Sequence, residues 1–133
     1  MNPSYTIVVA VIEENGAVFL VKRPAGTHLQ GYWEFPGGKI EAGETLERAL
    51  FREVREEVGW EILVLEKIDE VDYSYTDRDV HLHFYRCVRR TQEEPATPLE
   101  PLEYVWAPIQ KLSHYNIPPA NQKVVQNLIE RET

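Results

Sequence analysis

The sequence of 133 residues contains a single cysteine, Cys87. An internal disulfide and a cysteine-based metal cluster are therefore both excluded. We interpret Cys87 as a half-buried strand residue of a protein in a reducing compartment. Long hydrophobic runs are also missing, because the apolar stretch over residues 5–12 is far too short to span a membrane and no basic segment precedes it. We expect a cytoplasmic protein with no membrane partner.

Positive charge is scarce as well. The chain has 14 Lys and Arg residues against 22 Asp and Glu residues, which gives a formal net charge of −8. Nonspecific binding to a nucleic acid polymer needs a basic surface, so this class of partner is excluded. If the ligand is itself an anion, a metal ion is the obvious carrier of the missing positive charge.

The pattern of apolar and turn residues predicts one α/β domain over residues 1–133. Apolar, β-branched runs predict strands, and two stretches with helical spacing predict helices. The predicted strands are 5–12, 17–23, 61–75, 79–90 and 102–109; the predicted helices are 45–58 and 118–132; the predicted loops are 24–33 and 91–101. This order suggests a mixed β-sheet sandwiched between helices, and it leaves open whether the protein is a monomer or a homodimer.

The helix over residues 45–58 places three glutamates on one face. With Glu53 at zero on a helical wheel, Glu57 lies at about +40° and Glu56 at about −60°. Apolar residues lie beside this acidic strip, so the acids should stand at the rim of the buried face. Arg48 and Arg52 are expected to point elsewhere, near 220° and 260° by the same geometry. Like charges at these spacings repel.

A hard divalent cation would relieve this repulsion, since Mg²⁺ and Mn²⁺ prefer oxygen ligands. The alternative is an ordinary solvated acidic face. The preceding "PGG" favours the metal, because it offers a bare backbone carbonyl at Gly37 and leaves room for a ligand at Gly38. Glu44 lies within reach of Arg52, and this pair could fix the loop to the helix.

These residues resemble the Nudix hydrolase family. The Nudix box G-x5-E-x7-R-E-U-x-E-E-x-G-U is filled without exception by Gly38, Glu44, Arg52, Glu53, Val54, Glu56, Glu57, Gly59 and Trp60. The runs "WEFPGGKIEAGET" and "PPAN" are similar to those of its MutT-type branch, the 8-oxo-dGTP pyrophosphohydrolases. The resemblance implies an α/β/α sandwich, the Nudix fold, and hydrolysis of a nucleoside diphosphate linked to another group, with Mg²⁺ or Mn²⁺ as cofactor.

The resemblance also implies roles for single residues. The Gly37 carbonyl and the carboxylates of Glu53, Glu56 and Glu57 would bind metal, and Glu53 is the best candidate for the base that accepts a proton from water. Glu103 occupies the position of the family's distal acid, a further ligand or base; its alternative is a strand-edge glutamate that faces water.

The substrate side is assigned to four residues, three of which have an alternative interpretation. Arg23 matches an arginine that lies against the nucleotide, although an arginine at a strand end is more often a surface charge. Lys39 reaches a phosphate or is simply solvated. Gly38 leaves room for the ligand. Asn121 matches the family's base-reading asparagine, whose amide both donates and accepts; its alternative is an N-cap for the last helix.

His81 and His83 alternate on a predicted strand and should face the same side. A zinc site would need a third ligand, and no nitrogen or sulfur ligand has suitable spacing. We therefore interpret both histidines as partly exposed residues of the sheet. Tyr73, Tyr75, Phe84 and Trp33 could stack on a base, although core packing is the better interpretation for most of them.

The sequence thus predicts a MutT-type Nudix enzyme that converts nucleoside triphosphates to monophosphate and pyrophosphate, with 8-oxo-dGTP as first candidate. A CTP or 5-substituted dCTP pyrophosphohydrolase is the second interpretation, on the likeness of "HLHFY" and "YVWAP" to a sister group. A non-catalytic nucleotide-binding module is a third, which the intact box disfavours.

Overall fold

A mixed sheet organises the chain. The computed structural model describes residues 2–27, 29–91, 98 and 103–131. Within these residues the main strand order is β3-β2-β1-β6-β5, with β4 paired to β1 and β7 paired to β2. The elements are β1 (Ser4–Glu14), β2 (Ala17–Lys22), β3 (Trp33–Glu34), β4 (Gly37–Lys39), α1 (Leu46–Val58), β5 (Ile62–Tyr75), β6 (Arg78–Arg89), β7 (Tyr104–Pro108), the 3₁₀ turns η1 (Ile109–His114) and η2 (Pro119–Asn121), and α2 (Gln122–Arg131).

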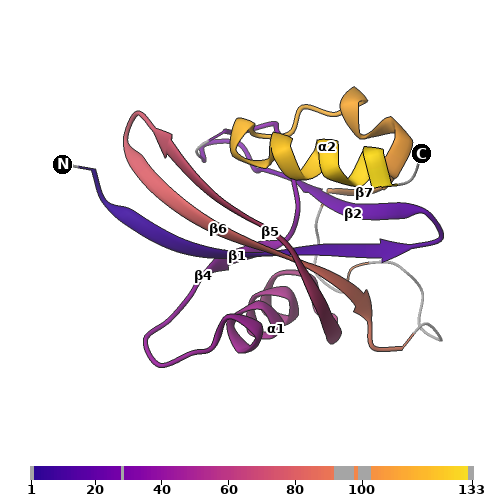
Figure 1. Cartoon of the computed structure of the whole chain (residues 1–133), viewed down its shortest axis with the longest axis horizontal. Helices are drawn as coiled ribbons and strands as arrows, with labels where there is room; N and C mark the ends of the chain where they lie inside the picture. Colours follow the sequence, from indigo (N-terminus) through magenta and orange to yellow (C-terminus); the bar gives the residue numbers. More distant parts are fainter. Residues whose placement is uncertain (1, 28, 92–97, 99–102, 132–133) are drawn as a thin grey trace.

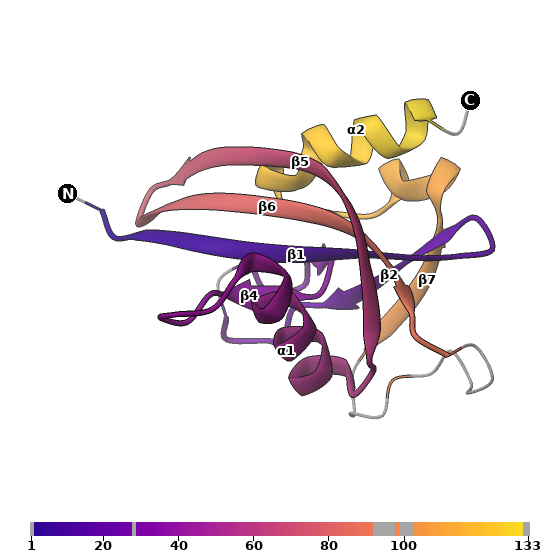
Figure 2. The ribbon, with the colours of Figure 1, turned by 60° about the horizontal axis from the view of Figure 1, so that its bottom comes forward.

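Helices cover the sheet from both sides. Figures 1 and 2 show α1 against one face and α2, with the 3₁₀ turn η1, against the other. Each interface is filled by its own apolar cluster: Val54 of α1 belongs to one, and Leu128 of α2 to the other. The predicted α/β/α sandwich is confirmed.

The central pairing is between β1 and β6, which run parallel from Ser4 opposite Asp79 to Ile12 opposite Cys87. Because successive side chains of a strand point to opposite faces, Leu82 and Phe84 enter the α2-side core while Tyr85 and Cys87 enter the α1-side core. Cys87 is fully buried, not half-buried as predicted, because the α1-side core closes over it.

The sequence predicted α1 closely because its ends are local signals. Thr45 Oγ1 accepts a hydrogen bond from the Arg48 amide at 3.2 Å, as an N-cap does. Gly59 ends the helix with φ +88°, in the left-handed region that glycine adopts without a steric cost. These two caps fix where the acidic face of α1 begins and ends.

Other predictions were incomplete. The last residue of the predicted loop over 24–33 is the first residue of β3, and β4 begins within the "EFPGG" segment that follows. Both strands are too short to show a periodic pattern of apolar residues. The last helix begins later than predicted, at Gln122, because the prolines form a 3₁₀ turn first. The predicted strand over 102–109 is observed as Tyr104–Pro108. The predicted loop over 91–101 lies mostly outside the described residues.

Candidate active site

The acids of α1 differ in their exposure. The Glu53 side chain is 20% exposed and Glu57 is partly buried, so both stand at the rim of the buried face as predicted. Glu56 is different: its side chain is 64% exposed. Glu53 and Glu57 are therefore the two acids whose charges are incompletely solvated.

Arg52 lies against these acids, contrary to the prediction that it points elsewhere. Its Nη1 donates to Glu53 Oε1 at 2.9 Å and to Glu56 Oε2 at 3.3 Å. The wheel gave the direction of the Arg52 Cβ, but the long side chain carries the guanidinium toward the neighbouring acidic strip. The predicted contact with Glu44 is confirmed, with Nε donating to Glu44 Oε2 at 2.7 Å. This hydrogen bond lowers the pKa of Glu44 to about 2.

The backbone of β4 passes directly beside Glu53 and Glu57. A Cβ at Gly38 would lie 2.5 Å from Cδ of Glu53, so glycine is the residue that leaves the Glu53 carboxylate in its observed position. The Gly37 amide donates to Glu57 Oε2 at 3.4 Å. The strand thus places backbone polar groups and two carboxylates in one small region, which requires the two glycines.

Glu57 also faces a second partly buried acid, Glu34 of β3. Burial and, to a smaller extent, the charge of Glu34 together raise the pKa of Glu57 to about 7. The pKa of Glu34 is also raised by burial, against the opposing effect of Arg23. Arg23 Nη1 donates to both Glu34 oxygens, at 3.0 and 2.9 Å. Arg23 thus acts on two carboxylates, Glu34 and Glu57, and an additional positive charge would stabilise this pair of acids.

A cavity of about 170 Å³ opens beside this region. It is bordered by β1, β4 and β6 and by the 3₁₀ turn η2. All four residues that the sequence assigned to the substrate side contribute to its wall: Arg23, Gly38, Lys39 and Asn121. Residues far apart in the sequence are thereby brought to one concave site.

Asn121 immediately precedes α2, as the N-cap alternative requires. Its side chain nevertheless makes no hydrogen bond to any described residue, so it does not cap α2. The residue is 8% exposed and borders the cavity. Lys39 Nζ lies 3.8 Å from the centre of the Tyr5 ring, at another part of the same wall. Both side chains therefore have polar groups at the cavity.

Glu103 lies away from the other predicted metal ligands. Its side chain is 66% exposed and its Oε2 lies 3.2 Å from Lys22 Nζ. It borders an adjoining hollow whose wall also includes Glu34 and Glu57. The structure thus brings Glu103 to the same side of the molecule as Glu57, in an ion pair at the solvent edge.

Sequence reasoning missed several residues of the cavity wall. Glu34 is the most informative, because a glutamate between two aromatic residues in "WEFPGG" is a visible signal of a buried acid. Tyr75 and Arg78 also border the cavity, from the β5–β6 hairpin. Of the aromatic residues considered for stacking, Phe84 is in the core and only Tyr75 reaches this wall.

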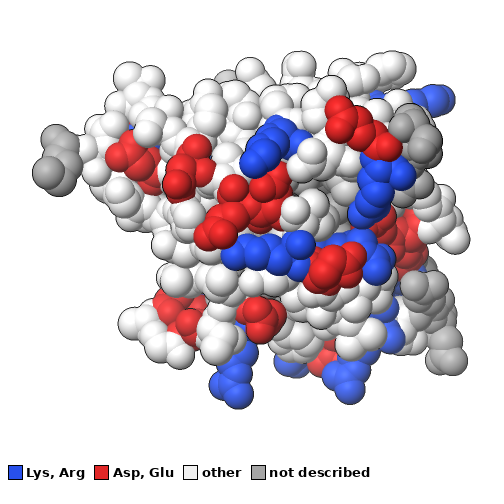
Figure 3. All heavy atoms as spheres, viewed as in Figure 1, with Lys and Arg blue, Asp and Glu red and all other residues white. Residues whose placement is uncertain are grey.

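The donor set near Gly37 fits a hard cation. Glu53 and Glu57 offer carboxylate oxygens, the Gly37 backbone is adjacent, and Glu57 is a buried acid that lacks full charge compensation. Oxygen-only donors are those that Mg²⁺ and Mn²⁺ prefer. On the face of the molecule in Figure 3, acidic side chains gather near the middle with basic side chains beside them.

Comparison with known proteins gives consistent results. The family model of the NUDIX domain matches residues 7–127. The 8-oxo-dGTP diphosphatase of Escherichia coli (strain K12) is 38% identical over 124 residues, which cover 92% of this chain and 94% of that protein. The CTP pyrophosphohydrolase of the same strain is 36% identical over 111 residues, covering 77% and 82%. The solution structure of MutT from methicillin-resistant Staphylococcus aureus 252 superposes with a TM-score of 0.77, at 30% identity, and covers 98% of this chain and 99% of that one.

Proposed function

The chain belongs to the Nudix hydrolase family, and we propose that it converts nucleoside triphosphates to the monophosphate and pyrophosphate, with 8-oxo-dGTP as its substrate. One observation carries this proposal: Arg23, Lys39 and Asn121 line one cavity together with the two glycines of β4. The backbone of those glycines lies directly beside the α1 acids Glu53 and Glu57. Similarity to an 8-oxo-dGTP diphosphatase over 94% of that protein's length supports the choice of nucleotide. We further propose that the enzyme acts on free nucleotides of the cytoplasm.

The phosphate end of the substrate is assigned to α1 and β4. Nudix hydrolases use divalent metals; we propose Mg²⁺ or Mn²⁺, held by Glu53, Glu56, Glu57 and the Gly37 carbonyl, with Glu103 as a further ligand. The chemistry that the cation supplies is neutralisation of phosphate charge and a lowered pKa of bound water.

Side chains of the protein accept the proton, orient the base and bind the phosphate. Glu53 is the proposed base, because its carboxylate contacts the β4 backbone and is only 20% exposed. Arg52 and Glu44 keep Glu53 oriented through the guanidinium that contacts both. Lys39 adds a positive charge at the cavity wall, where it can pair with a phosphate oxygen.

The base end is assigned to Asn121 and Arg23. The Asn121 amide offers a donor and an acceptor, which suits a purine edge that presents both. Its freedom from helix capping leaves the amide available for a base. Arg23 is oriented by two hydrogen bonds to Glu34, so its guanidinium forms a fixed part of the wall.

A cytosine nucleotide is the second candidate substrate. The specific observation in its favour is 36% identity to a CTP pyrophosphohydrolase over 82% of that protein. Both candidates use the same acids of α1 and differ only at the base end of the cavity.

The test is pyrophosphate release with Mg²⁺ from 8-oxo-dGTP, dGTP, dCTP, 5-methyl-dCTP and CTP. We expect a kcat/KM for 8-oxo-dGTP far above that for dGTP, and no turnover by Glu53→Gln. In Asn121→Ala the preference for 8-oxo-dGTP should shrink while the pyrophosphate chemistry remains. A preference for cytosine nucleotides would replace the proposed substrate, and an unchanged rate in Glu53→Gln would refute the assigned base.

A further inference from the structure

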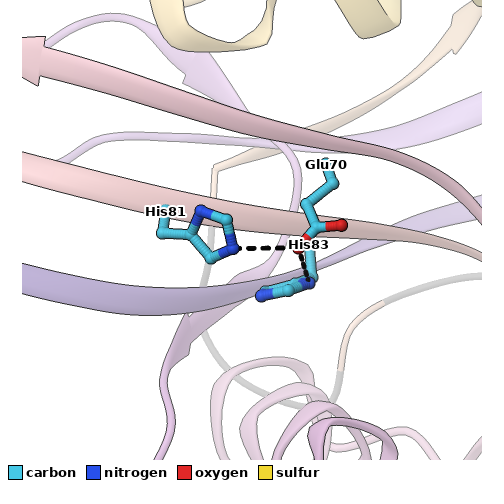
Figure 4. A group of neighbouring side chains, drawn as sticks. All are labelled: Glu70, His81 and His83. Carbon is cyan, nitrogen blue, oxygen red and sulfur yellow. Dashed lines mark hydrogen bonds and ion pairs between the residues drawn. The ribbon is translucent and has the colours of Figure 1, made fainter.

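A second group of ligand-type side chains lies on the β5–β6 hairpin, outside the residues of the proposed reaction. In the sheet register Glu70 stands opposite His83 and Asp72 opposite His81. Paired residues of neighbouring strands share a face, as do residues two apart on one strand. All four side chains therefore lie on the α1 side of the sheet. Figure 4 shows Glu70 reaching to both imidazole rings.

The three side chains in Figure 4 converge closely. Glu70 Oε1 lies 2.9 Å from His81 Nε2 and 3.4 Å from His83 Nδ1, and all three atoms lie within 4.8 Å of one another. Zinc–nitrogen and zinc–oxygen bonds of about 2.0–2.2 Å in a tetrahedron put neighbouring ligand atoms about 3.3 Å apart. The observed separations from Glu70 fall on either side of that value, so small side-chain rotations complete the geometry.

An irregularity in β5 brings Glu70 to this face. Between Lys67 and Asp69 the register advances two residues on β5 and one on β6, so Ile68 is an extra residue. Lys67 and Glu70 are three apart and would otherwise point to opposite faces. The extra residue instead places both on the α1 side, where Lys67 Nζ lies 3.4 Å from Glu70 Oε2.

His83 supplies the observation that points to a ligand. Its side chain is 9% exposed, and its Nδ1 is buried without a hydrogen bond to any described residue. A buried nitrogen without a partner is costly. Glu70 Oε1 is near it, but the geometry is not that of a hydrogen bond. A cation between the two atoms would give both of them a partner.

Asp72 and Lys67 orient the other two side chains of the cluster, His81 and Glu70 respectively. Asp72 Oδ1 contacts His81 Nδ1. When Nδ1 donates its proton to Asp72, Nε2 is the ring nitrogen left to bind a cation. A carboxylate behind a ligating histidine is the usual outer partner in zinc sites. Lys67 binds Oε2 of Glu70 and leaves Oε1 to face the histidines.

We propose that Glu70, His81 and His83 form a binding site for a divalent transition-metal ion of the zinc type, separate from the acids of α1. Two imidazole nitrogens and one carboxylate oxygen suit Zn²⁺, with a fourth position open to water. The sequence argument considered only nitrogen and sulfur as a third ligand; in this proposal the third ligand is a carboxylate, contributed by the neighbouring strand.

The two donor sets are separate in space. His83 and Gly38 both pair with Val8 of β1, so two strand spacings, about 10 Å, separate their backbones. They also differ in chemistry, since the α1 acids offer oxygen only. A test can therefore fill the α1 acids with Mg²⁺ and examine the histidine site alone.

The probe is Co²⁺ added to EDTA-treated, desalted protein in excess Mg²⁺, followed by its visible absorption and by competition with Zn²⁺. We expect one Co²⁺ per chain, displaced by one Zn²⁺. His81→Asn and Glu70→Gln, both at partly exposed positions, should each weaken Zn²⁺ binding at least tenfold. Asp72→Asn should weaken it by about 10–100-fold, as outer partners do.

Two control variants make the result specific. Glu66→Gln removes another exposed acid of β5, outside the cluster, and Glu53→Gln alters the α1 acids; both should bind Zn²⁺ as the unaltered protein does. The proposal is overturned if the unaltered protein binds no Zn²⁺ at micromolar concentration in excess Mg²⁺. It is equally overturned if Glu70→Gln and His81→Asn bind normally, or if Glu53→Gln abolishes binding.

Discussion

The guanidinium of Arg52 donates from Nε and Nη2 to the two carboxylate oxygens of Glu44, at 2.7 and 2.8 Å. The same Nη2 also donates to the Lys39 carbonyl at 3.2 Å, and Nη1 donates to Glu53. A planar fork with fixed donor directions can make these contacts together, whereas an ammonium cannot. The loop after β4 and the acidic face of α1 are thus joined through one side chain.

Replacing this fork should impair catalysis more than folding. We expect Arg52→Lys to lower kcat/KM by about 10²-fold, because loss of the second donor lets Glu53 move away from its working position. In a double-mutant cycle with Glu44→Gln the two losses should be strongly non-additive. Pyrophosphate release measures catalysis, and circular dichroism measures whether the variants fold. Fully additive losses in kcat/KM would contradict a shared role of Arg52 and Glu44.

The two glycines of β4 form a matched pair for a second test. An added Cβ at Gly38 meets the end of the Glu53 side chain, which can rotate away, whereas one at Gly37 overlaps the Val8 carbonyl oxygen of the backbone. We expect Gly38→Ala to fold normally and lose about 10²-fold in kcat. Gly37→Ala should unfold at clearly lower urea concentration, since the β1–β4 pairing has to shift. Equal stabilities for the two variants would contradict this assignment.

Glu57 should give the metal-free protein a pH-dependent stability. Its pKa is about 7 in the fold against an ordinary pKa of 4.5, so the folded state holds a proton that the unfolded chain releases. Stability from this group is fully present below pH 4.5 and is lost as pH rises through about 7.

We therefore expect Glu57→Gln to be more stable than the unaltered protein at pH 8 in EDTA, by about 3 kcal/mol, and similar to it at pH 4.5. Urea unfolding at the two pH values measures the difference, in which the contributions of other groups cancel. Parallel pH profiles of the two proteins would rule out this interpretation.

Cys87 should be inert in the native protein. Burial raises the pKa of its thiol to about 12 from an ordinary pKa of 9.0, and the side chain is inaccessible. The fraction present as thiolate at pH 8 is then about 10³-fold lower than for a free thiol. Iodoacetamide should label the urea-unfolded chain quickly and the folded chain negligibly, as mass spectrometry would show. Rapid labelling of the folded protein would place Cys87 outside the core.

The parts of the fold that the sequence predicted are those set by local signals. Helix α1 was predicted to within a residue because Thr45 and Gly59 cap it through contacts with their own neighbours. The box acids were identified in the same way, because their spacing within one helix determines their common face. Strands β3 and β4 were not predicted, since a strand of two or three residues is too short to show a periodic pattern.

The parts that were missed depend on contacts between distant residues. The wheel placed the Arg52 Cβ correctly but not its guanidinium, which is positioned by Glu44 and Glu53. Glu70 joins the two histidines only because Ile68 is an extra residue of β5, and nothing in the local pattern marks it. For Asn121 the sequence left a helix cap as the alternative to base binding, and only the folded chain shows that the residue borders the cavity.

The parallel pairing of β1 with β6 has a consequence for how the chain folds during synthesis. Ser4 leaves the ribosome roughly 75 residues before Asp79, its partner in the sheet. At about 5–20 residues per second, this is a delay on the order of 4–15 seconds. During that time one edge of the apolar β1 can pair with β2, but its other neighbour does not yet exist. Until β6 is synthesised, the nascent chain therefore carries an apolar strand with one unpaired edge, which is prone to aggregation.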